Sequence, residues 1–165
     1  HSYWNLEKIK KNKIYNHELK LNSNKYLQID KDLIPTGKTK SVKNSIYDFL
    51  KFQNLGKKLN FFKNKKIDPK HKGFDTTYIV KKNSRNFVGS LKNNNSNVQV
   101  NFFSNLPGVQ LYSAQNLNYK KKLFPYHGIC LETQYFPDSP NKKNFPSTLI
   151  KANKRYTCFT KIKIY

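Results

Sequence analysis

The sequence lacks the features that mark a secreted or a membrane-spanning protein. It contains two cysteines, Cys130 and Cys158, which are too few for a disulfide framework, so we expect a reducing, cytoplasmic environment. No apolar run approaches the roughly 20 residues that a membrane-spanning helix needs, and no signal peptide is visible, so we expect no membrane partner. The chain contains no Met, even at position 1, and we therefore expect it to begin inside a longer product.

Acidic residues are also scarce: nine Asp and Glu stand against 32 Lys and Arg, a formal net charge of +23. Such an excess ordinarily suggests nucleic acid or an anionic membrane as a partner. Only Arg85 and Arg155 are arginines, however, and nucleic-acid grooves favour arginine because its planar group binds two oxygens at once and stacks on bases. The lysines occur in scattered twos and threes, which is typical of a solvated surface and of an A/T-rich coding sequence. We therefore expect no nucleic-acid partner from the charge alone.

Motifs for metals and organic cofactors are missing as well. The four histidines, His1, His17, His71 and His127, do not pair with Cys or with each other at a metal-binding spacing. The chain has no phosphate-cradling glycine loop, no dinucleotide fingerprint and no nucleophile elbow. We expect no metal and no cofactor, and we interpret both cysteines as small core residues.

What the sequence does contain is period-two alternation of apolar and polar residues, with little helical periodicity. Aromatic residues make up 15% of the chain, so it can build a packed core. The pattern predicts about eight strands between Pro, Gly and Asn turn signals: 17–21, 26–29, 74–80, 86–91, 97–103, 108–113, 128–135 and 156–164. We expect a turn at 35–37, a short helical turn within 53–62, and loops at 63–72 and 92–97. Many short strands indicate one all-β domain over residues 1–165, an antiparallel β-sandwich or barrel.

Two of the acidic residues lie in apolar segments and are candidates for function. Glu132 is flanked by apolar and aromatic residues in 128–136, where a buried carboxylate is costly unless it has a partner or a task. Alternation leaves open that Glu132 faces water instead. Asp75 opens an apolar strand and is either a strand-end cap or a ligand contact.

Five segments, taken in order, resemble one known family. They are His1-Ser-Tyr-Trp-Asn-Leu6, Leu33-Ile-Pro-Thr-Gly37, Gly73-Phe-Asp75, Pro107-Gly-Val-Gln-Leu-Tyr112 and Cys130-Leu-Glu-Thr-Gln134, with 136–141 and 145–146 following the last. Together they look like the C-terminal half of an aldose 1-epimerase, the galactose mutarotase family. Trp4 replaces the family's usual Phe, Thr76 stands where the family commonly has His, and 92–105 departs from the family pattern.

The resemblance implies a galactose mutarotase-like antiparallel β-sandwich, here lacking its N-terminal strands, with a sugar lying across one sheet. It implies an isomerase that interconverts the α and β anomers of free aldoses such as glucose and galactose, without a cofactor. Glu132 matches the family's base, and His1 matches the acid that protonates the ring oxygen. The matching sugar-binding positions are Asp75 and Gln110, while Trp4 or Tyr112 would pack on the apolar face of the sugar ring.

The resemblance also implies what the chain would need from elsewhere. The family's N-terminal half supplies an Asn-Arg pair and another active-site His, so we expect this chain alone to be a poor catalyst. Three alternatives stay open: a hexose-6-phosphate 1-epimerase, a non-catalytic carbohydrate-binding remnant and, from another class, a basic nucleic-acid-binding domain whose aromatics stack bases.

Overall fold

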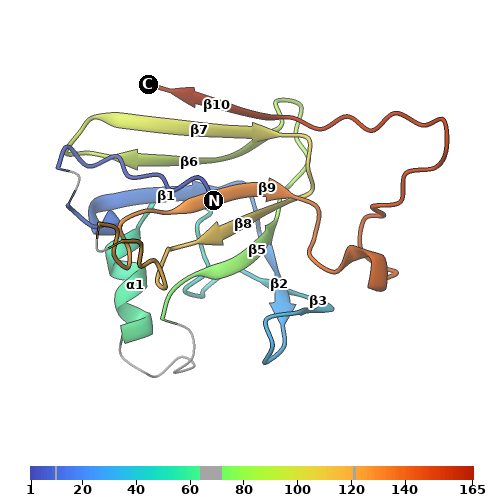
Figure 1. Cartoon of the computed structure of the whole chain (residues 1–165), viewed down its shortest axis with the longest axis horizontal. Helices are drawn as coiled ribbons and strands as arrows, with labels where there is room; N and C mark the ends of the chain where they lie inside the picture. Colours follow the sequence, from blue (N-terminus) through green and yellow to red (C-terminus); the bar gives the residue numbers. More distant parts are fainter. Residues whose placement is uncertain (10, 64–71, 121) are drawn as a thin grey trace.

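The computed structural model describes residues 1–9, 11–63, 72–120 and 122–165. Two antiparallel five-stranded sheets dominate it, one with the order β10-β7-β6-β1-β4 and the other β3-β2-β5-β8-β9 (Figure 1). The strands are β1 (His17–Leu21), β2 (Lys25–Ile29), β3 (Pro35–Ser41), β4 (Gln53–Asn54), β5 (Asp75–Ile79), β6 (Phe87–Asn93), β7 (Val98–Ser104), β8 (Gly108–Tyr112), β9 (Cys130–Gln134) and β10 (Thr160–Ile164). Single 3-10 turns, η1 (Ile14–Asn16) and η2 (Ser139–Asn141), complete the short elements.

The core lies between the two sheets and follows from alternation along their strands. In β1 every second residue is buried, beginning with His17, and β7 buries Val100 and Phe102 in the same way. Because successive side chains of a strand point to opposite faces, this pattern gives each sheet one apolar face. The second sheet contributes buried residues from three neighbouring strands: Tyr78 of β5, Val109 and Leu111 of β8, and Leu131 of β9.

One helix, α1 (Leu55–Lys63), closes an end of this core. It buries Leu55, Leu59 and Phe62, a spacing of four and three residues that places them on one side of a helix. The Phe62 ring lies 5.0 Å from that of Phe74, the residue before β5. Within the described ranges, no helix is long and apolar enough to cross a membrane.

The expected antiparallel β-sandwich is confirmed, and most of the expected strands are present within a residue or two of their predicted ends. The helix predicted within 53–62 is also present, preceded by β4. The predicted loop at 63–72, with His71, falls almost wholly outside the described residues.

Three expectations were wrong. Residues 35–37 do not form the expected turn but begin β3. Pairing with β2 holds this segment in an extended conformation, although it has little apolar character of its own. The strand expected at 156–164 starts only at Thr160. Cys158 is exposed, so only Cys130 of the two free cysteines is buried.

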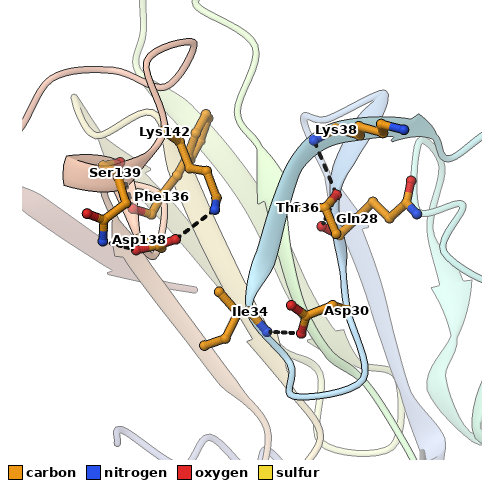
Figure 2. Close-up of polar contacts among 10 residues, drawn as sticks. Gln28, Asp30, Ile34, Thr36, Lys38, Phe136, Asp138, Ser139 and Lys142 are labelled. Atoms are coloured by element: carbon orange, nitrogen blue, oxygen red, sulfur yellow. Dashed lines mark hydrogen bonds and ion pairs between the residues drawn. The ribbon is translucent and has the colours of Figure 1, made fainter.

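The β2–β3 hairpin is held by its own polar side chains. The Asp30 carboxylate accepts the backbone N–H of Ile34 at 3.0 Å, and the Thr36 hydroxyl donates to the Gln28 carbonyl at 3.2 Å (Figure 2). An aspartate that accepts backbone N–H groups a few residues ahead stabilises a tight turn.

The segment that contains η2 lies across from this hairpin in Figure 2 and is braced in a similar way. The Ser139 hydroxyl donates to the Phe136 carbonyl at 2.7 Å, and the Lys142 ammonium lies 3.0 Å from the Asp138 carboxylate. The rings of Phe136 and Phe145 pack on Leu27 of β2. The segment therefore packs on β2, and its Phe136 ring also lies close to Gly108 at the start of β8.

Candidate functional site

Three central positions of the second sheet form a polar row on the face opposite the core. In the β5–β8 and β8–β9 registers, Thr77 lies opposite Gln110, and Gln110 lies opposite Glu132. Asp75 lies opposite Tyr112 in the same register. Directly paired residues point to one face of a sheet, and their chain neighbours, such as Leu111 and Leu131, are buried on the other. The alternative left open by alternation is thereby resolved: the Glu132 side chain points away from the core.

The side chains of this row are hydrogen-bonded to one another. The Thr77 hydroxyl donates to the Gln110 side-chain carbonyl, and the Gln110 amide nitrogen donates to the Asp75 carboxylate at 2.6 Å. This chain of donors fixes the orientation of the Gln110 amide. A carboxylate has about four acceptor positions, so Asp75 retains capacity to accept a hydrogen bond from a ligand hydroxyl.

The segment that carries His1 is paired with the start of β9. Trp4 and Ile129 form an antiparallel bridge, with N–H to O distances of 2.9 and 3.0 Å. Counting three residues back from Trp4 and three forward from Ile129 brings His1 opposite Glu132, and the N-terminus indeed lies beside β9 in Figure 1. The His1 Nε2 atom lies 4.0 Å from a Glu132 carboxylate oxygen, with the two side chains 53% and 30% exposed. An imidazole and a carboxylate are thus neighbours on an accessible surface.

Further contacts fix this N-terminal segment. The Asn5 side-chain amide donates to the carbonyls of Asn12 and His127 at 2.8 and 2.9 Å. The Leu6 N–H donates to Nε2 of the buried His17 at 2.7 Å. The Trp4 ring lies edge-on against Phe102 in the core, 5.6 Å between ring centroids.

Two tyrosines surround the His1 imidazole. The Tyr3 ring is stacked on it at 5.6 Å between centroids, and the Tyr112 ring meets it edge-on at 5.5 Å. Burial raises the pKa of both phenols, with smaller contributions from nearby carboxylates, so both stay neutral. Gly128 permits the close approach of Tyr3, because a Cβ on Gly128 would lie 2.8 Å from the Tyr3 Cβ.

Of the remaining histidine and cysteine of this region, Cys130 lies on the same sheet face as the polar row, opposite Tyr112 and two residues before Glu132. Burial, with Glu132 as a second cause, raises the pKa of the Cys130 thiol to about 12, so the thiol stays protonated and is a poor nucleophile. The His127 ring packs edge-on against Phe124, and its carbonyl accepts the Asn5 amide. Burial and the charge of Lys13 lower the pKa of His127. These contacts indicate a structural role for His127.

Burial lowers the pKa of His17 from 6.5 to about 4, against a smaller opposing effect of Glu7. The unfolded chain therefore binds more protons than the folded chain between these values, and stability falls as the pH is lowered through this window. At about 1.4 kcal/mol per pKa unit, we expect a loss of about 3 kcal/mol between pH 6.5 and 4. Urea unfolding across this range measures it. In His17→Gln, which cannot titrate, the slope should be smaller; an unchanged slope contradicts the assignment.

The structure thus brings together five of the six residues expected at a site: His1, Glu132, Asp75, Gln110 and Tyr112. The Trp4 ring packs into the core, and this packing lends no support to contact with a sugar. Thr76, the departure from the family pattern, lies opposite Leu111 on the core side, away from the polar row.

Sequence reasoning missed Tyr3 and Thr77. Each lies two residues from a recognised site residue, Tyr3 from His1 and Thr77 from Asp75. Period-two alternation would have placed both on the site face, so the signal was present in the sequence.

Comparisons with known proteins indicate one family over nearly the whole chain. A family model described as aldose 1-epimerase matches residues 1–163. The chain is 34% identical over 164 residues to galactose mutarotase of Bos taurus, a match to 94% of the chain and 46% of that protein. It is 25% identical to aldose 1-epimerase of Escherichia coli, covering 97% of the chain and 48% of that protein. The chain therefore spans about half the length of these relatives.

Among solved structures, an aldose epimerase homologue from C. elegans superposes with a TM-score of 0.79 at 21% identity, over 99% of this chain and 48% of that one. A galactose 1-epimerase from Lactobacillus acidophilus gives a TM-score of 0.67 at 19% identity, over 93% and 45%. At these identities the likeness shows a shared fold.

Proposed function

The chain belongs to the aldose 1-epimerase family, and on that premise we propose that its polar row interconverts the α and β anomers of a free hexose by acid–base ring opening. One observation carries the proposal: a histidine and a glutamate lie 4.0 Å apart, accessible to a ligand, beside a hydrogen-bonded Gln–Asp pair. Glucose and galactose are the expected substrates.

In the proposed reaction, the Glu132 carboxylate accepts the proton of the sugar's C1 hydroxyl while the protonated His1 imidazole donates a proton to the ring oxygen. The bond between C1 and the ring oxygen breaks, and an open-chain aldehyde forms. Rotation about the C1–C2 bond presents the other face of the carbonyl. Ring closure with the two roles reversed then gives the other anomer and restores both groups.

The neighbouring residues would bind and orient the sugar. Asp75 and Gln110 supply an acceptor and an amide for sugar hydroxyls, held in place by the hydrogen bond from Thr77. The rings of Tyr112 and Tyr3 flank His1 and would exclude water from one side of the reacting bond. Because both phenols are uncharged, they can contact an apolar face of the sugar. Neither phenol competes with Glu132 for the proton of the C1 hydroxyl.

Polarimetry on freshly dissolved α-galactose and α-glucose tests the proposal directly. The relatives are about twice as long as this chain, so the assay compares the 165-residue chain alone with the same chain joined to the N-terminal half of a relative. We expect the joined protein to accelerate mutarotation over buffer, and the chain alone to do so weakly or not at all. No acceleration by the joined protein contradicts the proposal.

A hexose-6-phosphate epimerase is the alternative on the same scaffold, and comparing rates on glucose and glucose 6-phosphate decides between the two. Lys40 of β3 lines a cavity together with Asp75, but it is paired with Tyr26, and Tyr26 is paired with the buried Tyr78. Lys40 therefore lies on the core side of the sheet and not on the face of the polar row. We expect faster turnover of the free sugar, and faster turnover of the phosphorylated sugar would replace the first candidate by the second.

Sugar binding without turnover is the remaining reading for the isolated chain. Calorimetry with galactose measures binding, and polarimetry on the same sample measures anomer exchange. Binding without exchange would identify the chain as a carbohydrate-binding module.

A further inference from the structure

We propose that His17 is a positioning residue for His1: as the buried acceptor for the Leu6 N–H, it holds the N-terminal segment in the register that places His1 opposite Glu132. The catalytic consequence rests on the proposed function, whereas the positioning itself does not. His17 lies in the first sheet and contacts neither Glu132 nor the other members of the polar row, so its effect would be exerted through the backbone of residues 1–6.

The contact requires a neutral imidazole with one defined tautomer. The His17 side chain is 0% exposed, and its Nε2 atom accepts the Leu6 N–H at 2.7 Å. A ring nitrogen that accepts a hydrogen bond carries no proton, so the proton resides on Nδ1. Leu6 itself packs against the core. A backbone N–H buried there without a partner would be costly, so this hydrogen bond selects one placement of the segment.

Three consecutive residues then fix the segment before it reaches His1. The backbone of Trp4 is bridged to Ile129, the Asn5 side chain binds two carbonyls, and the Leu6 N–H binds His17. Of these contacts, only that of Leu6 reaches the first sheet through a hydrogen bond. It therefore ties the segment that carries His1 to β1, while the Trp4 bridge ties it to β9.

Burial outweighs the groups around His17 that favour its protonated form and keeps the imidazole neutral. Glu7 follows Leu6, and its carboxylate is held by the side chains of Asn12 and Asn16 at 3.4 and 3.2 Å. Its negative charge raises the pKa of His17 and opposes the larger effect of burial. On the neighbouring strand β6, Asn93 lies opposite His17 in the register. Asn93 is uncharged. The charged group that shifts the pKa of His17 is therefore the Glu7 carboxylate.

Three substitutions separate positioning from general destabilisation. His17→Leu removes the acceptor, and His17→Gln keeps a side-chain oxygen at a similar reach. Leu19→Ala is the control, because Leu19 is fully buried two residues along the same strand and does not contact the Leu6 N–H. If His17→Leu fails to fold, His17→Asn takes its place, since the shorter side chain keeps a polar group but ends short of Leu6.

The primary readout is NMR on the unbound chain. Its ring contacts predict cross-relaxation from His1 to Tyr3 and Tyr112, whose centroids lie 5.6 and 5.5 Å away. We expect His17→Leu to lose these signals and to speed exchange of the Leu6 amide at least about tenfold, since the amide loses its buried partner. His17→Gln and Leu19→Ala should keep the ring signals, although Leu19→Ala lowers stability. Ring signals that persist in His17→Leu and His17→Asn overturn the proposal.

Turnover provides a second readout in any form of the protein that is active. A small displacement of a reacting group is costly, so we expect His17→Leu to lower kcat about 10- to 100-fold with KM nearly unchanged, and His17→Gln to restore most of the loss. A rise in KM with kcat preserved contradicts positioning of the acid. Absence of turnover in the unsubstituted protein would count against the proposed function alone, because the NMR test does not depend on activity.

Discussion

Replacing Glu132 by Gln is expected to slow mutarotation by about 10²–10⁴-fold, the usual contribution of a positioned proton-transfer group. The amide is nearly the same size as the carboxylate but cannot accept the proton of the C1 hydroxyl at neutral pH. The measurement is the first-order rate of optical rotation change with α-galactose, in whichever form of the protein shows activity.

Glu18→Gln is the matched control for this substitution. Glu18 lies on β1 in the other sheet, forms an ion pair with Lys92 at 2.9 Å, and its side chain is 27% exposed against 30% for Glu132. It therefore reports the effect of removing a half-exposed carboxylate away from the polar row. We expect Glu18→Gln to catalyse mutarotation at a rate within about twofold of the unsubstituted protein. Glu18 lies away from the polar row, and a surface ion pair contributes little to the stability of the fold. Equal losses in the two variants would contradict a special role for Glu132.

Phe74→Ala is expected to give the largest loss of stability, about 3–5 kcal/mol in the free energy of unfolding. Phe74 is 0% exposed and its ring lies 5.3 Å from Phe49 and 5.0 Å from Phe62, so truncation removes contacts to the segment between β3 and β4 and to α1. Urea unfolding followed by far-UV circular dichroism measures the change. Because Phe74 immediately precedes Asp75, a lower affinity for sugar should accompany the loss.

Phe61→Ala provides the comparison for this prediction. Phe61 is the neighbour of Phe62 in α1 but is 52% exposed, so the same chemical change removes little buried surface. We expect a change within about 0.5 kcal/mol, as for surface substitutions in general. If Phe61→Ala and Phe74→Ala destabilise the chain equally, the core described here is wrong.

The sequence allowed most strands to be predicted, because burial and alternation agree in them. In β1, buried and partly buried residues alternate from His17 to Leu21, and the predicted and observed ends coincide. β3 was missed because Pro35 and Gly37 are turn residues and the strand buries little. Its extended form depends on pairing with β2, a contact between segments that local pattern does not encode. β10 was predicted too long for a similar reason, since its residues pair only with β7 from Thr160 onward.

The candidate site was predicted less evenly. The sequence singled out Glu132 because its neighbours are apolar. It did not determine the direction of the Glu132 side chain, because that depends on whether the adjacent Leu131 is buried against the other sheet. His1 has no local signal at all, because a single histidine in a polar segment is ordinary; the family resemblance alone drew attention to it. Its approach to Glu132 depends on the bridge between Trp4 and Ile129, a contact across most of the chain length. Such a register is set by tertiary pairing and cannot be derived from composition or spacing.

We expect His1 and Glu132 to flank the same sugar, and a crystal structure of the protein with bound galactose shows whether they do. In that structure the C1 hydroxyl should lie within hydrogen-bond distance of the Glu132 carboxylate, the ring oxygen within hydrogen-bond distance of His1 Nε2, and other hydroxyls on Asp75 and Gln110. A galactose bound with C1 away from Glu132, or at another surface while the polar row holds no sugar, would show that the two residues do not act on one sugar ring.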